Sequence, residues 1–183
     1  MQRAFTTKYN NLTRVLFNRV GVCQPITPEE VKTQQIKVNE YLAIWDTGAT
    51  HSAITKKVAD DLELKPTGVR EVRHAKGKSV ANTYLVNIWL PNKLMVSQVR
   101  VTEVDLIPDD NTSDDQQPQI LIGMDIIGMG DFAVTNFNRK TTMSFRFPSV
   151  KEIDFIPEAD ESNIMEGGNR KMRRILRAKK RKG

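Results

Sequence analysis

The fold of this chain is decided by residues 45–54, which read Trp45-Asp46-Thr47-Gly48-Ala49-Thr50-His51-Ser52-Ala53-Ile54. An apolar run over residues 41–45 leads directly into Asp46, and Gly48 follows where a tight turn favours a residue without a side chain. The pattern predicts a buried strand that ends in a turn and presents one carboxylate at its end. An Asp-Thr/Ser-Gly tripeptide occurs by chance in roughly one chain in ten of this length, so its context has to carry the interpretation.

Supporting context lies about 75 residues further on, where the chain reads Gln119-Ile120-Leu121-Ile122-Gly123-Met124-Asp125-Ile126-Ile127-Gly128. Large aliphatic residues run straight into Gly123, and a short helical turn is expected to follow. With these two motifs in this order, the chain resembles the retropepsin-like aspartic proteases, and most of all their stand-alone cellular or bacterial members. The resemblance covers about residues 34–147.

The resemblance implies an aspartic endopeptidase that uses water as its nucleophile and needs neither a metal nor an organic cofactor. Asp46 is then the catalytic residue. The residues that shape its turn are Thr47, Gly48 and Ala49, those that brace it and border the substrate pockets are Ile122 and Gly123, and those in a flap over bound peptide are Lys76, Gly77, Lys78 and Ser79. The cationic flap tip is a hint of acidic substrates.

Hydrolysis by this route needs a water molecule held between two carboxylates. Two carboxylates about 3 Å apart cannot both be charged, so they share one proton, and an optimum below neutral pH is expected. The chain contains a single Asp-Thr/Ser-Gly tripeptide. We therefore expect an isologous homodimer in which each copy contributes its own Asp46.

The spacing of apolar residues predicts an all-β fold, a small closed acid-protease barrel of the retropepsin-like type, with one short helix. Turns recur every 8–12 residues, as in small barrels and sandwiches. The expected elements are a strand at 12–22, a strand or hairpin at 34–45, a helix at 55–62, a hairpin at 69–90 with its tip at 76–78, a strand at 94–104, a helical turn at 124–129 and a hairpin over 131–137 and 141–147. Tyr84, Val86, Ile88 and Leu90 alternate along the second arm of the long hairpin and are expected to share its buried face.

Charge divides the chain into segments. Residues 169–183 carry nine of the 28 basic residues and no acidic one, which leaves 28 − 9 = 19 basic against 22 acidic residues elsewhere. We predict a protease domain at 31–150, an extension at 1–30 that is either a strand or a removable pro-segment, and an acidic linker with a basic tail at 151–183. Three explanations of the tail stay open: a disordered end, a nucleic-acid contact through phosphates, or a helix with a narrow apolar stripe that docks on acidic protein or membrane.

Several features favour a cytoplasmic setting. No apolar run approaches the 18 residues of a membrane span, and the N-terminus lacks the apolar block of a signal peptide. Cys23 is the only cysteine, so no intrachain disulfide can form. The main alternative function is a catalytically inactive module that dimerises and binds peptides, tethered to nucleic acid by its tail.

Other residues have simpler interpretations. Asp125 is expected to be structural, either capping the helical turn or pairing with a base, and Asp46 itself could be an ordinary turn residue. His51 and His74 are too isolated for a metal site. Cys23 is expected to be a small buried residue.

Overall fold

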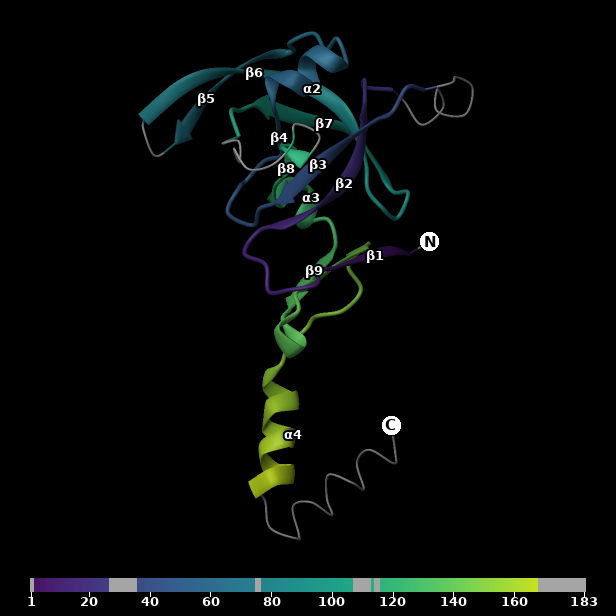
Figure 1. Cartoon of the computed structure of the whole chain (residues 1–183), viewed down its shortest axis with the longest axis vertical. Helices are drawn as coiled ribbons and strands as arrows, with labels where there is room; N and C mark the ends of the chain where they lie inside the picture. Colours follow the sequence, from purple (N-terminus) through teal and green to yellow (C-terminus); the bar gives the residue numbers. More distant parts are fainter. Residues whose placement is uncertain (1, 27–35, 75–76, 107–112, 114–115, 168–183) are drawn as a thin grey trace. The chain divides into compact units, whose positions relative to one another are not determined.

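The computed structural model describes residues 2–26, 36–74, 77–106, 113 and 116–167. It divides into two compact units, residues 1–150 and residues 151–183. Two sheets form most of the first unit (Figure 1). Their strands are β1 (Arg3–Lys8), β2 (Leu16–Cys23), β3 (Asn39–Trp45), β4 (Ala53–Ile54), β5 (Gly68–His74), β6 (Gly77–Trp89), β7 (Met95–Glu103), β8 (Pro118–Ile122), β9 (Asp131–Thr135) and β10 (Thr142–Phe147). The short helices between them are α2 (Lys56–Asp61), α3 (Met124–Ile127) and the 3₁₀ turn η2 (Phe137–Arg139).

The larger sheet closes on itself. Its strand order is β2-β3-β8-β4-β7-β6-β5, and β2 also pairs with β6, so that six strands form a closed barrel and β5 stays outside as an edge strand. At the closing seam, a Cβ on Gly21 would lie 2.6 Å from Val38 Cγ1 and 3.2 Å from Trp89 Cβ. A side chain at position 21 would have to displace Val38 and would crowd Trp89. The predicted all-β fold with a small closed barrel is confirmed.

Alternating side chains fill the barrel. The four residues predicted to share the buried face of β6 are all at most 4% exposed: Tyr84, Val86, Ile88 and Leu90. Opposite them, Ala43, Ile120 and Ile122 of the central strands β3 and β8 are fully buried. Burying each large aliphatic side chain contributes about 1.5–3 kcal/mol, so this interior is the main source of stability.

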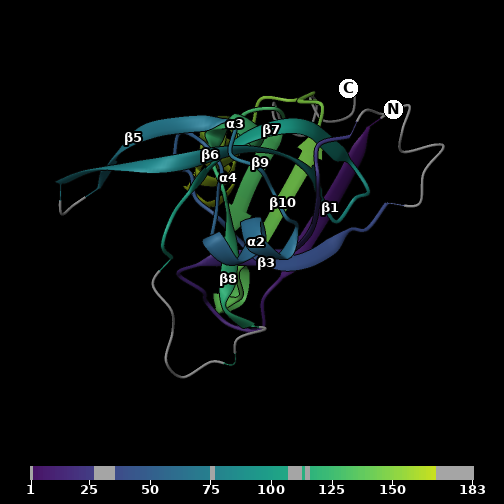
Figure 2. The same ribbon diagram turned by 90° about the horizontal axis from the view of Figure 1, so that it is seen from above.

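The smaller sheet has the strand order β1-β10-β9, and its three antiparallel strands lie side by side in Figure 2. It is joined to the barrel by aromatic side chains around Trp45, the last residue of β3. Phe5, Phe132 and Phe145 place their ring centroids 5.5–5.7 Å from that of Trp45. The Trp45 indole N–H donates to Asn18 Oδ1 at 3.0 Å, so its polar atom is satisfied as well.

The observed elements agree with most of the predicted ones. The segment at 34–45, for which a hairpin was also considered, contains the single strand β3, which pairs with β2 from Leu16↔Trp45 to Val22↔Asn39. The helix expected at 55–62 is α2, the turn expected after Gly123 is α3, and the long hairpin is β5–β6. Cys23 is buried, as predicted.

Five observed elements lie outside the predicted bounds, namely β1, β4, β8, η2 and α4, although a strand was one of the two expectations for the extension at 1–30. Strand β1 pairs in register with β10 from Arg3↔Phe147 to Lys8↔Thr142, although its sequence is mostly polar. In the second unit, residues 156–167 form helix α4 (Ile156–Gly167), where a linker was expected. The Ile156 N–H donates to Asp154 Oδ1 at 2.9 Å, and Pro157 and Glu158 occupy the first turn, where both residue types favour helix initiation. The basic tail at 168–183 lies outside the described residues.

Asp131 fastens the end of the first unit to β9. Its carboxylate accepts hydrogen bonds from the Ser149 hydroxyl at 2.5 Å, the Val150 N–H at 3.0 Å and the Arg146 guanidinium Nε at 2.9 Å. These donors hold the pKa of Asp131 well below its usual range, the Ser149 hydroxyl contributing most. The ionised form is therefore the one that stabilises the fold.

We predict that Asp131→Asn lowers the urea midpoint of unfolding at pH 7. Because the folded-state pKa is depressed, this stabilisation is present above the unfolded pKa of about 4 and is lost as the pH falls through the folded value. The difference between variant and wild type should therefore shrink as the pH is lowered from about 5 toward about 2. Asp60→Asn, which removes an exposed pair with Lys56, is the control and should change the midpoint little at any pH. A difference for Asp131→Asn that stays constant from neutral to strongly acidic pH would contradict this account.

Candidate active site

Asp46 lies immediately after β3 and is held by its own backbone. Its N–H donates to the Ile122 carbonyl at 2.9 Å, and its carbonyl accepts the Ala49 N–H at 3.2 Å. The Gly48 N–H donates to Asp46 Oδ1 at 2.8 Å. Asp46 is half-buried, and its Oδ2 accepts no hydrogen bond from any described residue. One carboxylate oxygen is thus fixed while the other is free to bind a ligand.

The topology explains why Gly123 is next to this turn. Strand β8 lies between β3 and β4, parallel to the first and antiparallel to the second. The segment of residues 46–52, named here the Asp46 loop, leads from β3 to β4 and must cross the end of β8. Gly123 is the first residue beyond that end, so the chain leaves β8 directly beneath the Asp46 loop.

The contact at Gly123 leaves no space for a side chain. A Cβ there would lie 2.6 Å from the His51 carbonyl carbon, 2.7 Å from its oxygen and 2.9 Å from the Ala49 oxygen. The next residue, Met124, donates its N–H to the same Ala49 carbonyl at 2.8 Å. The structure therefore brings together five of the residues singled out in the sequence, Asp46, Gly48, Ala49, Ile122 and Gly123, while Thr47 is exposed on the outside of the turn.

The hairpin β5–β6 extends beyond the barrel (Figure 1). Gly77, Lys78 and Ser79 begin β6 and pair with His74, Arg73 and Val72; Lys76 lies outside the described residues. The Lys78 ammonium is 2.9 Å from the Glu71 carboxylate, so its charge is partly compensated within the hairpin. On the same face, Val69 and Val80 are 70% and 72% exposed, which gives the hairpin apolar as well as charged surface.

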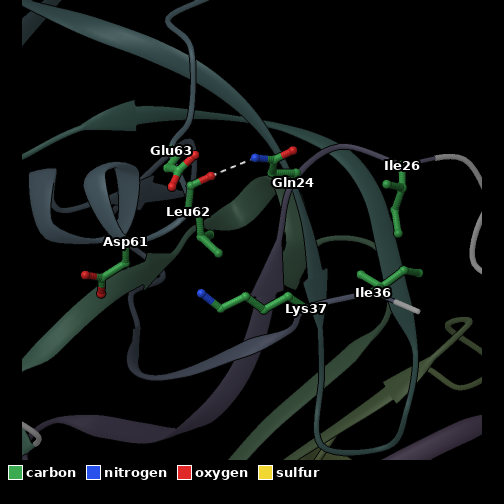
Figure 3. A pocket seen from close by; sticks show the side chains of 7 residues that line it. All are labelled: Gln24, Ile26, Ile36, Lys37, Asp61, Leu62 and Glu63. Carbon is green, nitrogen blue, oxygen red and sulfur yellow. Dashed lines mark hydrogen bonds between the residues drawn. The ribbon is translucent and has the colours of Figure 1, made fainter. Parts of the chain in front are cut away.

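The described cavities lie elsewhere on the barrel. A pocket of about 330 Å³ adjoins the end of α2, where the Gln24 side-chain amide donates to the Leu62 carbonyl at 2.9 Å (Figure 3). Its lining residues are Gln24, Ile26, Ile36, Lys37, Asp61, Leu62 and Glu63. A neighbouring pocket of about 490 Å³ shares Asp61. Neither is lined by Asp46 or by any other predicted site residue.

Other chemistries find little support in this part of the chain. Burial raises the pKa of the Cys23 thiol, which makes it a poor nucleophile. Among the described residues, no three His, Cys, Asp or Glu side chains are grouped so that they could hold a metal ion. None of the described helices has the length and apolar character needed to cross a membrane.

The sequence did not single out Ser52, although the structure places it at the centre of the site. Ser52 is completely buried at the end of the Asp46 loop and is hydrogen-bonded to both Gly123 and Asp125. Asp125 accepts hydrogen bonds from Ser52 and from the Ile126 N–H, so its contacts are those of a structural residue, as expected, but its partner is a hydroxyl and not a base. A serine among polar loop residues gives no sequence signal for such a role.

We predict that Gly123→Ala destabilises the protein by about 1–3 kcal/mol, because the new methyl group must displace the backbone of the Asp46 loop. Urea unfolding measures this difference. Gly68→Ala is the matched control, since its Cβ would meet only the Thr83 hydroxyl at 3.4 Å, an ordinary contact distance. Equal stabilities of Gly123→Ala and Gly68→Ala would show that the close approach at Gly123 is unimportant.

Comparison with known proteins places the chain in a family. The crystal structure of a retropepsin-like aspartic protease from Rickettsia conorii is similar to this chain at 13% sequence identity and a TM-score of 0.47, with 80% of this chain and 95% of that chain covered. No match was found among the curated proteins. The family model for aspartyl proteases matches residues 31–126, slightly more than half of the chain, and includes residues 45–54 and most of the second motif. The predicted relationship is confirmed, and the protein belongs to the aspartyl protease family.

Proposed function

We propose that the protein is an aspartic endopeptidase in which the Asp46 carboxylates of two copies activate the water that cleaves a peptide bond. The observation that carries the proposal is the state of Asp46. One of its oxygens is fixed by the Gly48 N–H, and the other is unpaired among the described residues and open to solvent. This is the arrangement that a carboxylate needs to share a proton and a water molecule with a second carboxylate.

The chemistry requires the pair to hold one proton. The ionised carboxylate takes a proton from water as the water oxygen attacks the carbonyl carbon of the substrate. The protonated carboxylate donates to the carbonyl oxygen, which gives a neutral tetrahedral diol. When the C–N bond breaks, the protonated carboxylate gives its proton to the leaving nitrogen and the ionised carboxylate takes a proton from one diol hydroxyl, so the pair again holds one proton. Such titrations belong to the pair and not to one aspartate.

The need for a second copy follows from the sequence and the loop. The chain holds one Asp-Thr/Ser-Gly tripeptide, so one copy supplies one such carboxylate. Thr47 and Gly48 are exposed beside Asp46, which leaves this edge of the Asp46 loop free to meet an identical loop across a two-fold axis. The Thr47 hydroxyl is hydrogen-bonded to no described residue, and the proposed dimer gives it a partner in the second loop.

The hairpin offers a place for the substrate. An extended peptide can pair with a free strand edge and place alternate side chains in pockets. Strand β5 is an edge strand of the larger sheet, and the exposed Val69 and Val80 lie on one face of its hairpin. We propose that this face, which includes Lys78, contacts the peptide, and that Ile122 and Gly123 support the catalytic loop from below; Ser79 lies on the opposite face of β6.

We predict that Asp46→Asn lowers peptide hydrolysis by about 100- to 10,000-fold, because the amide cannot act as general base. Cleavage of a peptide library, read by mass spectrometry, measures the effect. Asp60→Asn changes an exposed carboxylate of α2 in the same way and should leave the rate unchanged. A wild-type protein that binds peptides without cleaving them would instead support the non-catalytic peptide-binding module.

We predict that activity depends on pairing between copies. When wild-type protein is mixed with an equal amount of Asp46→Asn, random exchange should reduce the activity per wild-type chain to about one half, and a ninefold excess should reduce it to about one tenth. The same excess of an unrelated protein is the control. Activity that is unaffected by the inactive variant, from a species that sediments as a monomer, would contradict the shared site.

A further inference from the structure

Ser52 has every polar group occupied at the point where the Asp46 loop enters β4. Its hydroxyl donates to Asp125 Oδ1 at 2.7 Å and accepts the Gly123 N–H at 3.1 Å. Its N–H donates to Asp125 Oδ2 at 2.9 Å, and its carbonyl accepts the Thr102 N–H at 3.4 Å. A hydroxyl that donates to one group and accepts from another has its orientation fixed. The three residues Ser52, Gly123 and Asp125 are named here the clasp.

Asp125 matches this arrangement as an acceptor. Besides the two donors of Ser52, its Oδ1 accepts the Ile126 N–H at 3.0 Å, so three donors converge on one carboxylate. An ionised carboxylate only accepts hydrogen bonds and can take all three at once. Because Asp125 belongs to α3, it ties the helix that follows β8 to the far end of the Asp46 loop.

Little else determines the shape of the Asp46 loop. Thr47, Gly48, Thr50 and His51 are exposed, so side-chain packing does not hold the middle of the loop. Two residues that flank Gly123 hold it by backbone contacts: Ile122 accepts the Asp46 N–H at its start, and Met124 donates to Ala49 in its middle. The clasp provides the third attachment and is the one that depends on side chains. These three attachments hold the loop from which the Gly48 N–H donates to Asp46 Oδ1, so together with that hydrogen bond they determine where the Asp46 carboxylate points.

We propose that Ser52 and Asp125 are positioning residues that hold the Asp46 carboxylate in the orientation used for peptide hydrolysis. This inference rests on the proposed function. A carboxylate that shares a proton with a partner about 3 Å away tolerates little displacement, and an error of about 1 Å in such a site can reduce the rate roughly 100-fold. Neither clasp side chain reaches the substrate in this proposal, so the loss falls on the chemical step and not on peptide binding.

The test compares Asp125→Ala, Ser52→Ala and the double variant with wild type. We expect each to lower kcat roughly 100-fold, with KM changed less than about threefold. The kcat of the double variant should be no lower than that of the less active single variant, because the two residues act as one unit. Asp125→Asn should recover part of the rate, since its amide oxygen can accept the Ser52 hydroxyl while its NH₂ group faces the Ser52 N–H. Asp61→Ala is the matched control. Like Asp125, Asp61 accepts hydrogen bonds from two residues, here Tyr41 and Lys57, but these partners lie outside the Asp46 loop and α3.

A second measurement is independent of activity. Amide hydrogen exchange should accelerate at least about tenfold at Gly48 and Ala49 in the clasp variants, while the amides of Val86 and Ile88 in β6 keep their protection. In Asp61→Ala, the loop amides should exchange as in wild type. Each rate is measured well below the melting temperature of the variant, so that global unfolding does not contribute.

The two measurements separate the clasp from the proposed function. If wild type is inactive and exchange accelerates as expected, the peptidase proposal fails while the attachment by the clasp stands. Unchanged loop exchange in Asp125→Ala, or an unchanged kcat in an active enzyme, overturns the positioning role. A fall in kcat in Asp61→Ala that equals the fall in Asp125→Ala would overturn it as well, because the effect would then reflect general destabilisation.

Discussion

The structure depends on the parallel pairing of β3 with β8, which puts Trp45 beside Ile122. Both strands end at this point, so the Asp46 N–H finds the Ile122 carbonyl and the two sequence motifs become one site. Because β4 lies on the other side of β8, the connection from β3 to β4 has to cross over the chain that leaves β8. A glycine at position 123 is a consequence of that crossing, since two backbones meet there without space for a side chain.

The same strand end also holds the second sheet. Successive residues of a strand point to opposite faces, so Trp45 turns away from the side on which Asp46 is presented. Its indole contacts Phe5, Phe132 and Phe145, one ring from each strand of the smaller sheet. The residue before the candidate catalytic aspartate therefore contacts all three strands of the smaller sheet. The bulky aromatic residue beside Asp46 thus has a structural role.

Elements and sites that depend on neighbouring residues could be predicted from the sequence. Those that depend on contacts between residues far apart in the chain could not. The alternation along β6 and the apolar run into Asp46 gave the barrel strands and the candidate site turn. A strand was one of two expectations for residues 1–30, but the bounds of β1 could not be predicted because Arg3–Lys8 is mostly polar and becomes a strand through pairing with β10, about 140 residues away. Helix α4 lacks an apolar periodicity, and its start depends on Asp154 and Pro157. The partnership of Ser52 with Asp125 joins residues 73 positions apart, and the pairing of Lys78 with Glu71 depends on hairpin register.

The proposed dimer explains why the Asp46 loop is held by hydrogen bonds and not by packing. Two identical loops can meet across an axis only if their tips are uncovered, and the exposed Thr47 and Gly48 satisfy that condition. An uncovered tip gains little stability from burial, so its shape has to be fixed from beneath by hydrogen bonds, which here join the buried Ser52 to the exposed Asp125. Ser52 is completely buried and Gly123 is in backbone contact with the loop, and both lie on the side away from the tip. The exposure required for the reaction and the rigidity required for catalysis are thus supplied by opposite sides of one seven-residue segment, residues 46–52.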